Sequence, residues 1–153
     1  MVAALRANPT IWIGRLLVAL VVLVSLRLSL WGNQHGMPFA FNSDENAHFV
    51  PKAIGLFGHD WNPDYFVNPP GYTDLLYEVF SQTFGGGAGV AKQLAVDPTP
   101  VFTSARTTTG FLLAISVWLL YLAGAKMFHN RRVGVLAAGA AALGLVGDIG
   151  LVG

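Results

Sequence analysis

The sequence predicts an all-α integral membrane protein, and three observations support that prediction. Of the 153 residues, 54% are hydrophobic and 11% are charged, whereas a soluble domain averages about 25% charged residues. Three long apolar segments stand apart from the rest of the chain, and seven of the eight acidic residues fall between the first and the second of them. We therefore expect membrane-spanning helices joined by one polar loop.

Residues 11–31 form the first predicted span, because about 20 apolar residues are needed for a helix to cross ~30 Å of hydrocarbon. Arg15 and Arg27 lie near its two ends, where long side chains can reach the headgroups. Trp12 and Trp31 lie where interfacial aromatic residues are expected. A cleaved signal peptide has a similar apolar core, but further spans follow, which favours a retained helix.

Residues 102–124 form the second predicted span and residues 133–153 the third, with a basic turn at 125–132 between them. The third span is rich in Ala and Gly, which allow close helix packing. Basic residues gather in the N-terminal segment and in the turn, which places both in the cytoplasm and the loop of residues 32–100 outside. Because the chain stops within an apolar run, we expect it to be part of a longer membrane protein.

Composition excludes several kinds of site. The chain has no cysteine, so disulfides, zinc–thiolate centres and cysteine nucleophiles are ruled out. Its formal net charge of +1 gives no indication of a nucleic-acid partner. The lipid bilayer is the partner that the composition predicts.

The loop contains two predicted interfacial helices. Ser43 can cap the first, and Asp44 and Glu45 fall in its first turn, where the helix dipole favours acidic side chains. Pro51 should kink this helix, and Gly58 can end it. Its apolar face is predicted at Phe49, Val50, Ala53, Ile54 and Phe57.

The second interfacial helix is expected to begin at Asn68-Pro69-Pro70, with Asn68 as its cap. About a dozen residues with apolar positions at helical spacing cannot span a bilayer, so this helix should lie in the membrane interface. The stretch 85–87, Gly-Gly-Gly, is expected to be a flexible connector. The apolar positions are Tyr72, Leu75, Leu76, Val79, Phe80 and Phe84.

The acidic pair is the candidate site. A carboxylate of Asp44 or Glu45 held near the outer membrane surface can act as a general base, although two acids at a helix start also stabilise it by ~0.3–1 kcal/mol each without any catalytic role. Asp44 and His48, four residues apart, are a partial site for a divalent metal. Lys52 and Arg106 can bind a phosphate, or else anchor the chain at the interface.

These residues together resemble the N-terminal part of the GT-C glycosyltransferases, and most of all the protein O-mannosyltransferases and the lipid A aminoarabinose transferases. The resemblance rests on the order of short motifs. They are Asp44-Glu45-x-x-His48, then Tyr65-Phe66-Val67-Asn68-Pro69-Pro70, then Ala105-Arg106 opening a span. The chain departs from the family pattern at two places. Residues 85–100 look like an insertion. Asn68-Pro69-Pro70-Gly71 lacks the basic residue and the following leucine that are usual in the family.

The resemblance implies a partial GT-C fold, with three transmembrane helices and two interfacial helices in the first extracytoplasmic loop. It implies a transferase that moves a sugar from a polyprenyl-phosphate donor to a hydroxyl of a glycan, lipid or protein acceptor. Asp44 would be the catalytic base or a metal-assisted carboxylate, Glu45 would support it or contact the acceptor, and Arg106 would contact the leaving phosphate. His48, Lys52 and Asn68 would contact substrate. A multi-pass protein of the bacterial plasma membrane is expected, with a divalent metal as its one candidate cofactor.

Two other functions stay open at this point. The chain can be a non-catalytic membrane protein whose outer loop binds a partner. It can also belong to a transporter in which Asp148, an acidic residue inside the third span, carries a proton.

Overall fold

The computed structural model describes residues 9–38, 44–58 and 67–150, and the regular structure of these ranges is helical. Backbone contacts divide the chain into two units. We call residues 1–31 with 110–153 the bundle unit, and residues 32–109 the loop unit. The all-helical prediction is therefore confirmed for the described residues.

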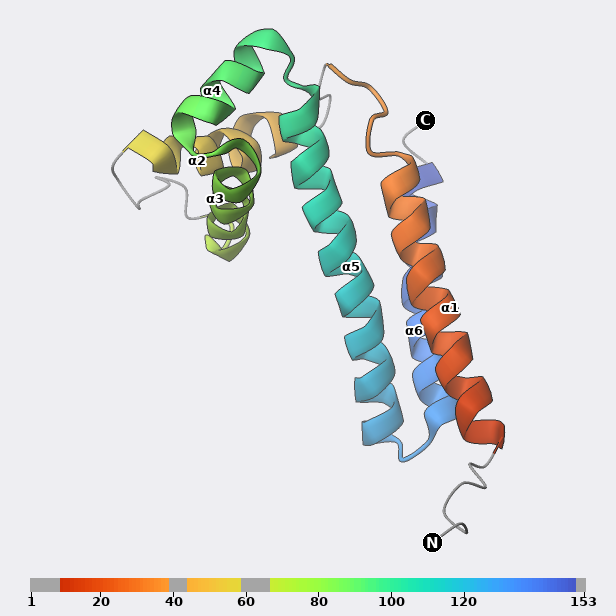
Figure 1. The fold of residues 1–153 in the computed structure, drawn as a ribbon. Coiled ribbons are helices and arrows are strands. Elements are labelled where there is room, and N and C mark those ends of the chain that lie inside the picture. The colour runs from red at the N-terminus through yellow and green to blue at the C-terminus, as the bar shows by residue number, and fades with distance from the viewer. Residues whose placement is uncertain (1–8, 39–43, 59–66, 151–153) are drawn as a thin grey trace, which may run out of the picture. The chain divides into compact units, whose positions relative to one another are not determined.

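The bundle unit consists of α1 (Pro9–Trp31), α6 (Arg131–Gly150) and the part of α5 (Thr99–Met127) from Gly110 onward. Helix α6 packs along α1 and runs in the same direction, whereas α5 runs antiparallel to α6 (Figure 1). The first residues of α1 and the turn between α5 and α6 consequently lie at one end of this unit (Figure 1).

Within the described residues, α1 from Trp12 to Trp31 and α5 are the two helices long and apolar enough to cross a membrane. Their large apolar side chains face outward: Leu16 is 67% exposed, and Leu23 is 62% exposed. Such surfaces are favourable in lipid and costly in water, so these two helices indicate a membrane protein. The third predicted span corresponds to α6, which is helical over residues 131–150, and the last residues of that prediction, 151–153, lie outside the described residues.

The two arginines of α1 point toward its ends, as the sequence predicts. The guanidinium of Arg15 lies 5.3 Å from the ring centroid of Trp12, and that of Arg27 lies 5.1 Å from the ring centroid of Trp31. Each pair is a cation–π contact that directs the charge away from the middle of the helix. A long apolar helix can thereby carry two arginines without burying either charge in hydrocarbon.

Helices α5 and α6 come close together at two glycines. A Cβ added to Gly124 would lie 3.1 Å from the Cα of Gly134, and a Cβ added to Gly134 would lie 2.5 Å from the carbonyl oxygen of Tyr121. Backbone is therefore packed against backbone next to the turn, as small residues permit in membrane helices. This contact holds the α5–α6 hairpin together.

We expect Gly134→Ala to destabilise the hairpin, because its new methyl group overlaps backbone that cannot move aside. Overpacking of this kind costs about 1–3 kcal/mol, which thermal unfolding in detergent micelles would show as a lower Tm. Gly139→Ala is the matched control, since Gly139 lies in the same helix with nothing within 4 Å of an added Cβ. Equal Tm values for the two variants would contradict this packing.

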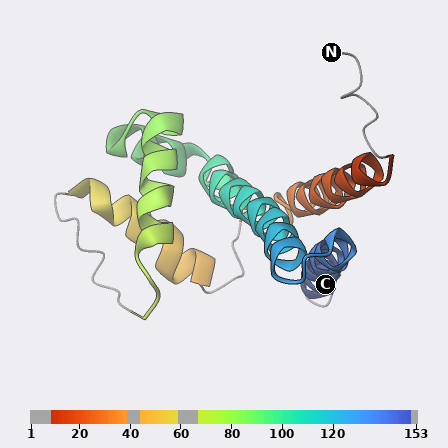
Figure 2. The same ribbon diagram turned by 90° about the horizontal axis from the view of Figure 1, so that it is seen from below.

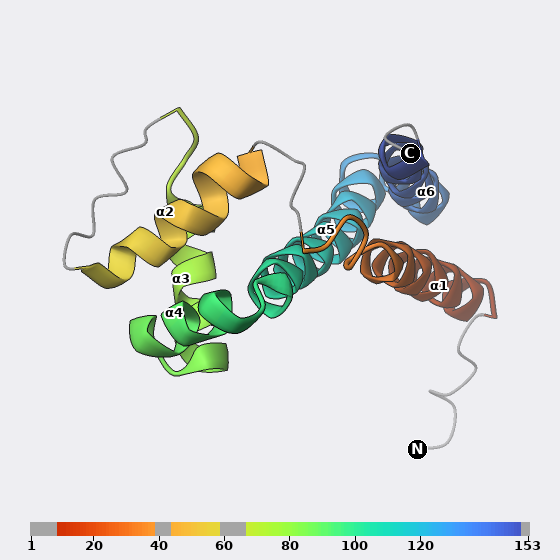
Figure 3. The same cartoon turned by 90° about the horizontal axis from the view of Figure 1, so that it is seen from above.

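The loop unit has a hydrophobic core of its own. It comprises a π-helical segment η2 (Asp44–Phe49), α2 (Val50–Gly55), a 3₁₀ turn η3 (Leu56–Gly58), α3 (Gly71–Phe84), α4 (Gly87–Val96) and the first turns of α5. Helices α2, α3 and α4 gather around the beginning of α5 (Figures 2 and 3). The buried core residues are Val50, Ala53, Leu76, Phe80, Val90, Val101, Phe102 and Ala105.

This core shows that protein covers much of the apolar face of each helix predicted to lie in the membrane interface. Val50 of α2 and both Leu76 and Phe80 of α3 are at most 1% exposed, so the apolar faces of these helices are covered by protein. An apolar stripe gains similar free energy whether lipid or another apolar stripe covers it. The sequence pattern therefore identified the buried faces correctly but could not identify what buries them.

The starts of the two predicted helices also differ in detail. The predicted single kinked helix is instead η2 followed by α2, with the change just before Pro51, which occupies the first turn of α2 where a missing N–H costs least. Ser43, the predicted cap, lies outside the described residues. Asn68 does not cap α3, because that helix begins at Gly71 with Pro70 in the N-cap position and no side-chain cap.

The triglycine stretch is a defined turn rather than a flexible connector. Gly85 and Gly86 adopt φ values of +77° and +93°, which glycine reaches at little cost. The amide of Gly85 donates to the carbonyl of Ser81 and ends α3, and α4 begins at Gly87. The predicted insertion thus contains a helix whose Val90 lies in the core.

Candidate functional site

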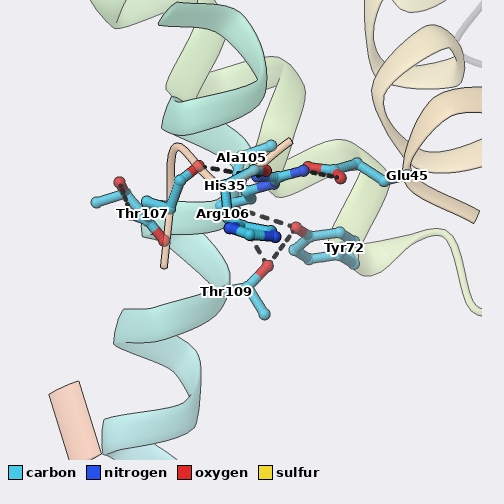
Figure 4. A network of polar contacts seen from close by, with 8 residues as sticks. His35, Glu45, Tyr72, Ala105, Arg106, Thr107 and Thr109 are labelled. Carbon is cyan, nitrogen blue, oxygen red and sulfur yellow. Dashed lines mark hydrogen bonds and ion pairs between the residues drawn. The ribbon is translucent and has the colours of Figure 1, made fainter. Parts of the chain in front are cut away.

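Arg106 and Glu45 form a two-pronged ion pair within the loop unit (Figure 4). The Nε–H of Arg106 donates to Oε1 of Glu45 at 2.8 Å, and its Nη2–H donates to Oε2 at 2.9 Å. The side chains are 22% and 15% exposed, respectively. Two parallel hydrogen bonds between opposite charges fix the direction of both side chains more strictly than a single contact does.

Arg106 also binds the segment that follows α1. Its Nη1 donates to the carbonyl oxygens of Asn33 and His35 at 2.9 and 2.8 Å. Asn33 is itself 8% exposed, and its Nδ2 donates to Oγ1 of Thr107 at 2.8 Å. Four of the five guanidinium N–H groups are therefore used within the protein. Arg106 joins residues 33–35, η2 and α5 at one point.

Tyr72 extends this polar network from α3 to α5. Its hydroxyl lies 2.6 Å from Oγ1 of Thr109 and 3.3 Å from the carbonyl oxygen of Ala105, to which it donates (Figure 4). Burial raises the pKa of Tyr72, the hydrogen bond with Thr109 lowers it, and the nearby charge of Glu45 raises it further, with a net upward shift. The neutral hydroxyl is thus favoured, so Tyr72 remains a hydrogen-bond donor well into the alkaline range.

Asp44 and Glu45 are adjacent in sequence but have different surroundings. Asp44 is exposed at the first residue of η2, whereas the carboxylate of Glu45 is half-buried against Arg106. Of the two acids, Glu45 is thus the one whose carboxylate links η2 to α5 through its ion pair with Arg106. Asp44 is the one that a substrate in solution can approach.

The other predicted site residues come from three segments of the loop unit. His48 follows Asp44 in η2, Lys52 lies on α2, and Asn68 precedes α3; each is half-buried. For the metal, the described residues contain no group of three or more His, Cys, Asp or Glu side chains that could hold one. Asp44 and His48 supply two candidate ligands where Ca²⁺ or Mg²⁺ usually takes six or more.

Sequence reasoning missed the partners of Arg106 and Tyr72. The acceptors in the segment after α1 are the backbone carbonyls of Asn33 and His35, which any residue type supplies, so no sequence signal marks them. Tyr72 was assigned to the apolar face of α3, and its hydroxyl function is invisible to a hydropathy pattern. Thr107 and Thr109 lie near the start of the second predicted span, and nothing in the sequence pattern indicates that their hydroxyl groups bind Asn33 and Tyr72.

Comparison with protein-family models, with curated proteins and with solved structures found no match for this chain.

We expect Arg106→Lys to loosen the segment of residues 32–37, although it keeps the positive charge. Lysine has three N–H donors and no planar fork, so it cannot reproduce the four hydrogen bonds that Arg106 makes with Glu45, Asn33 and His35. Loss of these charged hydrogen bonds should lower the free energy of unfolding by about 1–3 kcal/mol. Faster hydrogen exchange at the amide of His35, which donates to the carbonyl of Gly32 at 2.9 Å, would report the loosening.

Arg27→Lys is the matched control for that experiment, because Arg27 is an exposed arginine that contacts Trp31 in the bundle unit. Its exchange at His35 should equal that of the wild-type protein. If both variants exchange alike, Arg106 does not hold the segment.

Proposed function

We propose that this chain is the N-terminal part of a membrane glycosyltransferase of the GT-C type. The enzyme moves a sugar from a polyprenyl-phosphate donor to an acceptor hydroxyl on the extracytoplasmic side of a bacterial plasma membrane. The order of the motifs around Asp44-Glu45, Pro69-Pro70 and Arg106 supports this proposal. The observation that carries it is the difference between the two adjacent acids, one exposed and the other paired with Arg106.

In the proposed reaction, the acceptor hydroxyl oxygen forms a bond to the anomeric carbon of the sugar. The bond from that carbon to the polyprenyl phosphate breaks, and the phosphate leaves with the bonding electrons. Asp44 takes the proton of the hydroxyl as general base. Its exposure at the start of η2 suits a residue that must meet an incoming acceptor.

Glu45 is a positioning residue in this proposal, and so is Arg106. With four N–H groups used in the protein, Arg106 retains a single Nη2 hydrogen for any other partner. Lys52 is therefore the better candidate for the leaving phosphate, and His48 and Asn68 remain candidate substrate contacts. Since Asp44 and His48 are the only ligands proposed for a metal, no step is assigned to one.

We expect Asp44→Asn to abolish sugar transfer without loss of expression or thermal stability, because the amide cannot accept the proton. Full-length protein would be assayed with a radiolabelled polyprenyl-phosphate sugar, and loss of at least 100-fold in rate is expected for a missing general base. Glu78→Gln, a change at an exposed acid of α3, serves as control. Normal transfer by Asp44→Asn would refute the role of Asp44.

The proposed topology places the loop unit outside the cell, the α5–α6 turn in the cytoplasm and α6 as a third span. The chain has no native cysteine, so single cysteines can report the side on which a residue lies. In intact cells, a membrane-impermeant maleimide should label Glu78→Cys and spare Asn130→Cys until the cells are opened. The reverse pattern would exclude an extracytoplasmic site.

A further inference from the structure

Charge is divided sharply between the two units. Residues 32–109 hold three basic and seven acidic residues, for a formal charge of −4, whereas the rest of the chain holds six basic residues and Asp148, for a charge of +5. The bundle unit therefore has almost no carboxylate of its own to neutralise its cations. An outside anion is the natural partner for that charge.

Three of these cations lie in the seven residues of the α5–α6 turn, which we call the basic tip. Lys126 lies in the last turn of α5, while Arg131 and Arg132 begin α6, and all three are exposed. The amide of Arg132 donates to Oδ1 of Asn130 at 2.9 Å, which caps α6. This cap and the glycine contact between α5 and α6 both lie at the basic tip.

The basic tip also exposes large apolar side chains. Met127 is 74% exposed and Phe128 is 64% exposed, directly between Lys126 and the two arginines. Apolar groups flanked by cations are unfavourable in water but fit the boundary between lipid headgroups and acyl chains. Because α5 is one of the two candidate spans and ends at Met127, the tip follows the point where that span meets the membrane surface.

The start of α1 adds a further cation at this end of the bundle unit. Helix α1 begins at the same end as the turn (Figure 1), and Arg15 lies in its second turn, exposed and stacked on Trp12. Arginine and tryptophan together are typical of a membrane interface. Four exposed basic side chains thus share one end of the unit.

We propose that the basic tip binds the headgroups of anionic phospholipids. The phosphates pair with Lys126, Arg131 and Arg132, while Met127 and Phe128 insert among the acyl chains. A free phosphate ion would use the cations but leave the two apolar side chains in water, so the lipid fits the whole surface better. This binding is independent of the proposed glycosyl transfer, since none of these residues belongs to the loop unit.

The proposal is tested on the full chain, purified in a neutral detergent and stripped of lipid. Phosphatidylglycerol is added, with phosphatidylcholine and glycerol 1-phosphate in parallel, and native mass spectrometry gives the apparent Kd. Because each basic residue contributes roughly a fivefold gain at an anionic surface, neutralising all three in Lys126→Gln/Arg131→Gln/Arg132→Gln should weaken phosphatidylglycerol binding by more than tenfold. Binding should also weaken as salt is raised.

Lys92→Gln is the control for loss of positive charge elsewhere in the chain, because it removes an exposed cation that lies in the loop unit. It should leave binding unchanged. Should the triple variant fail to fold, Met127→Ser/Phe128→Ser keeps every charge and should still weaken lipid binding. Equal affinity for phosphatidylcholine, equal binding of glycerol 1-phosphate, or unchanged binding in the variants would each overturn the proposal.

Discussion

The arrangement of the loop unit depends on the hydrogen bonds that the guanidinium of Arg106 donates. This group holds a carboxylate from η2 and two backbone carbonyls from the segment after α1, and it does so from the second turn of α5. These three segments are far apart in the sequence and have no disulfide to join them. The planar fork of donors binds the carboxylate through two hydrogen bonds and leaves two further N–H groups for the carbonyls. The position of Asp44, next to Glu45, follows from that contact.

The two units differ in how their apolar side chains are removed from water. In the loop unit, α2, α3, α4 and the start of α5 cover one another, and their core side chains are withdrawn from solvent. In the bundle unit, α1 and α5 leave large apolar side chains exposed, a surface that is favourable in lipid. One helix, α5, takes part in both: Val101, Phe102 and Ala105 pack in the loop-unit core, and later residues face outward.

The functional assignments follow the same division. The polar network and the exposed Asp44 belong to the loop unit, which carries most of the negative charge and none of the lipid-facing surface proposed here. The basic tip belongs to the bundle unit, with its exposed Met127 and Phe128. Within the acidic pair, the ion pair with Arg106 separates a structural carboxylate from an accessible one, a distinction that a shared helix start would not create by itself.

Much of this protein was predictable from local sequence. The helices of residues 9–31, 71–84 and 99–127, the apolar faces of α2 and α3, and the outward course of Arg15 and Arg27 all follow from spacing along the chain, because a helix is built from neighbours in sequence. What only the tertiary structure decided was which surfaces and charges meet. Leu76 and Phe80 pack on protein instead of lipid, residues 87–96 form a helix in that core, and Arg106 holds Glu45 and two carbonyls. These contacts join segments that are distant in the sequence and meet only on folding, so a pattern of neighbouring residues cannot predict them.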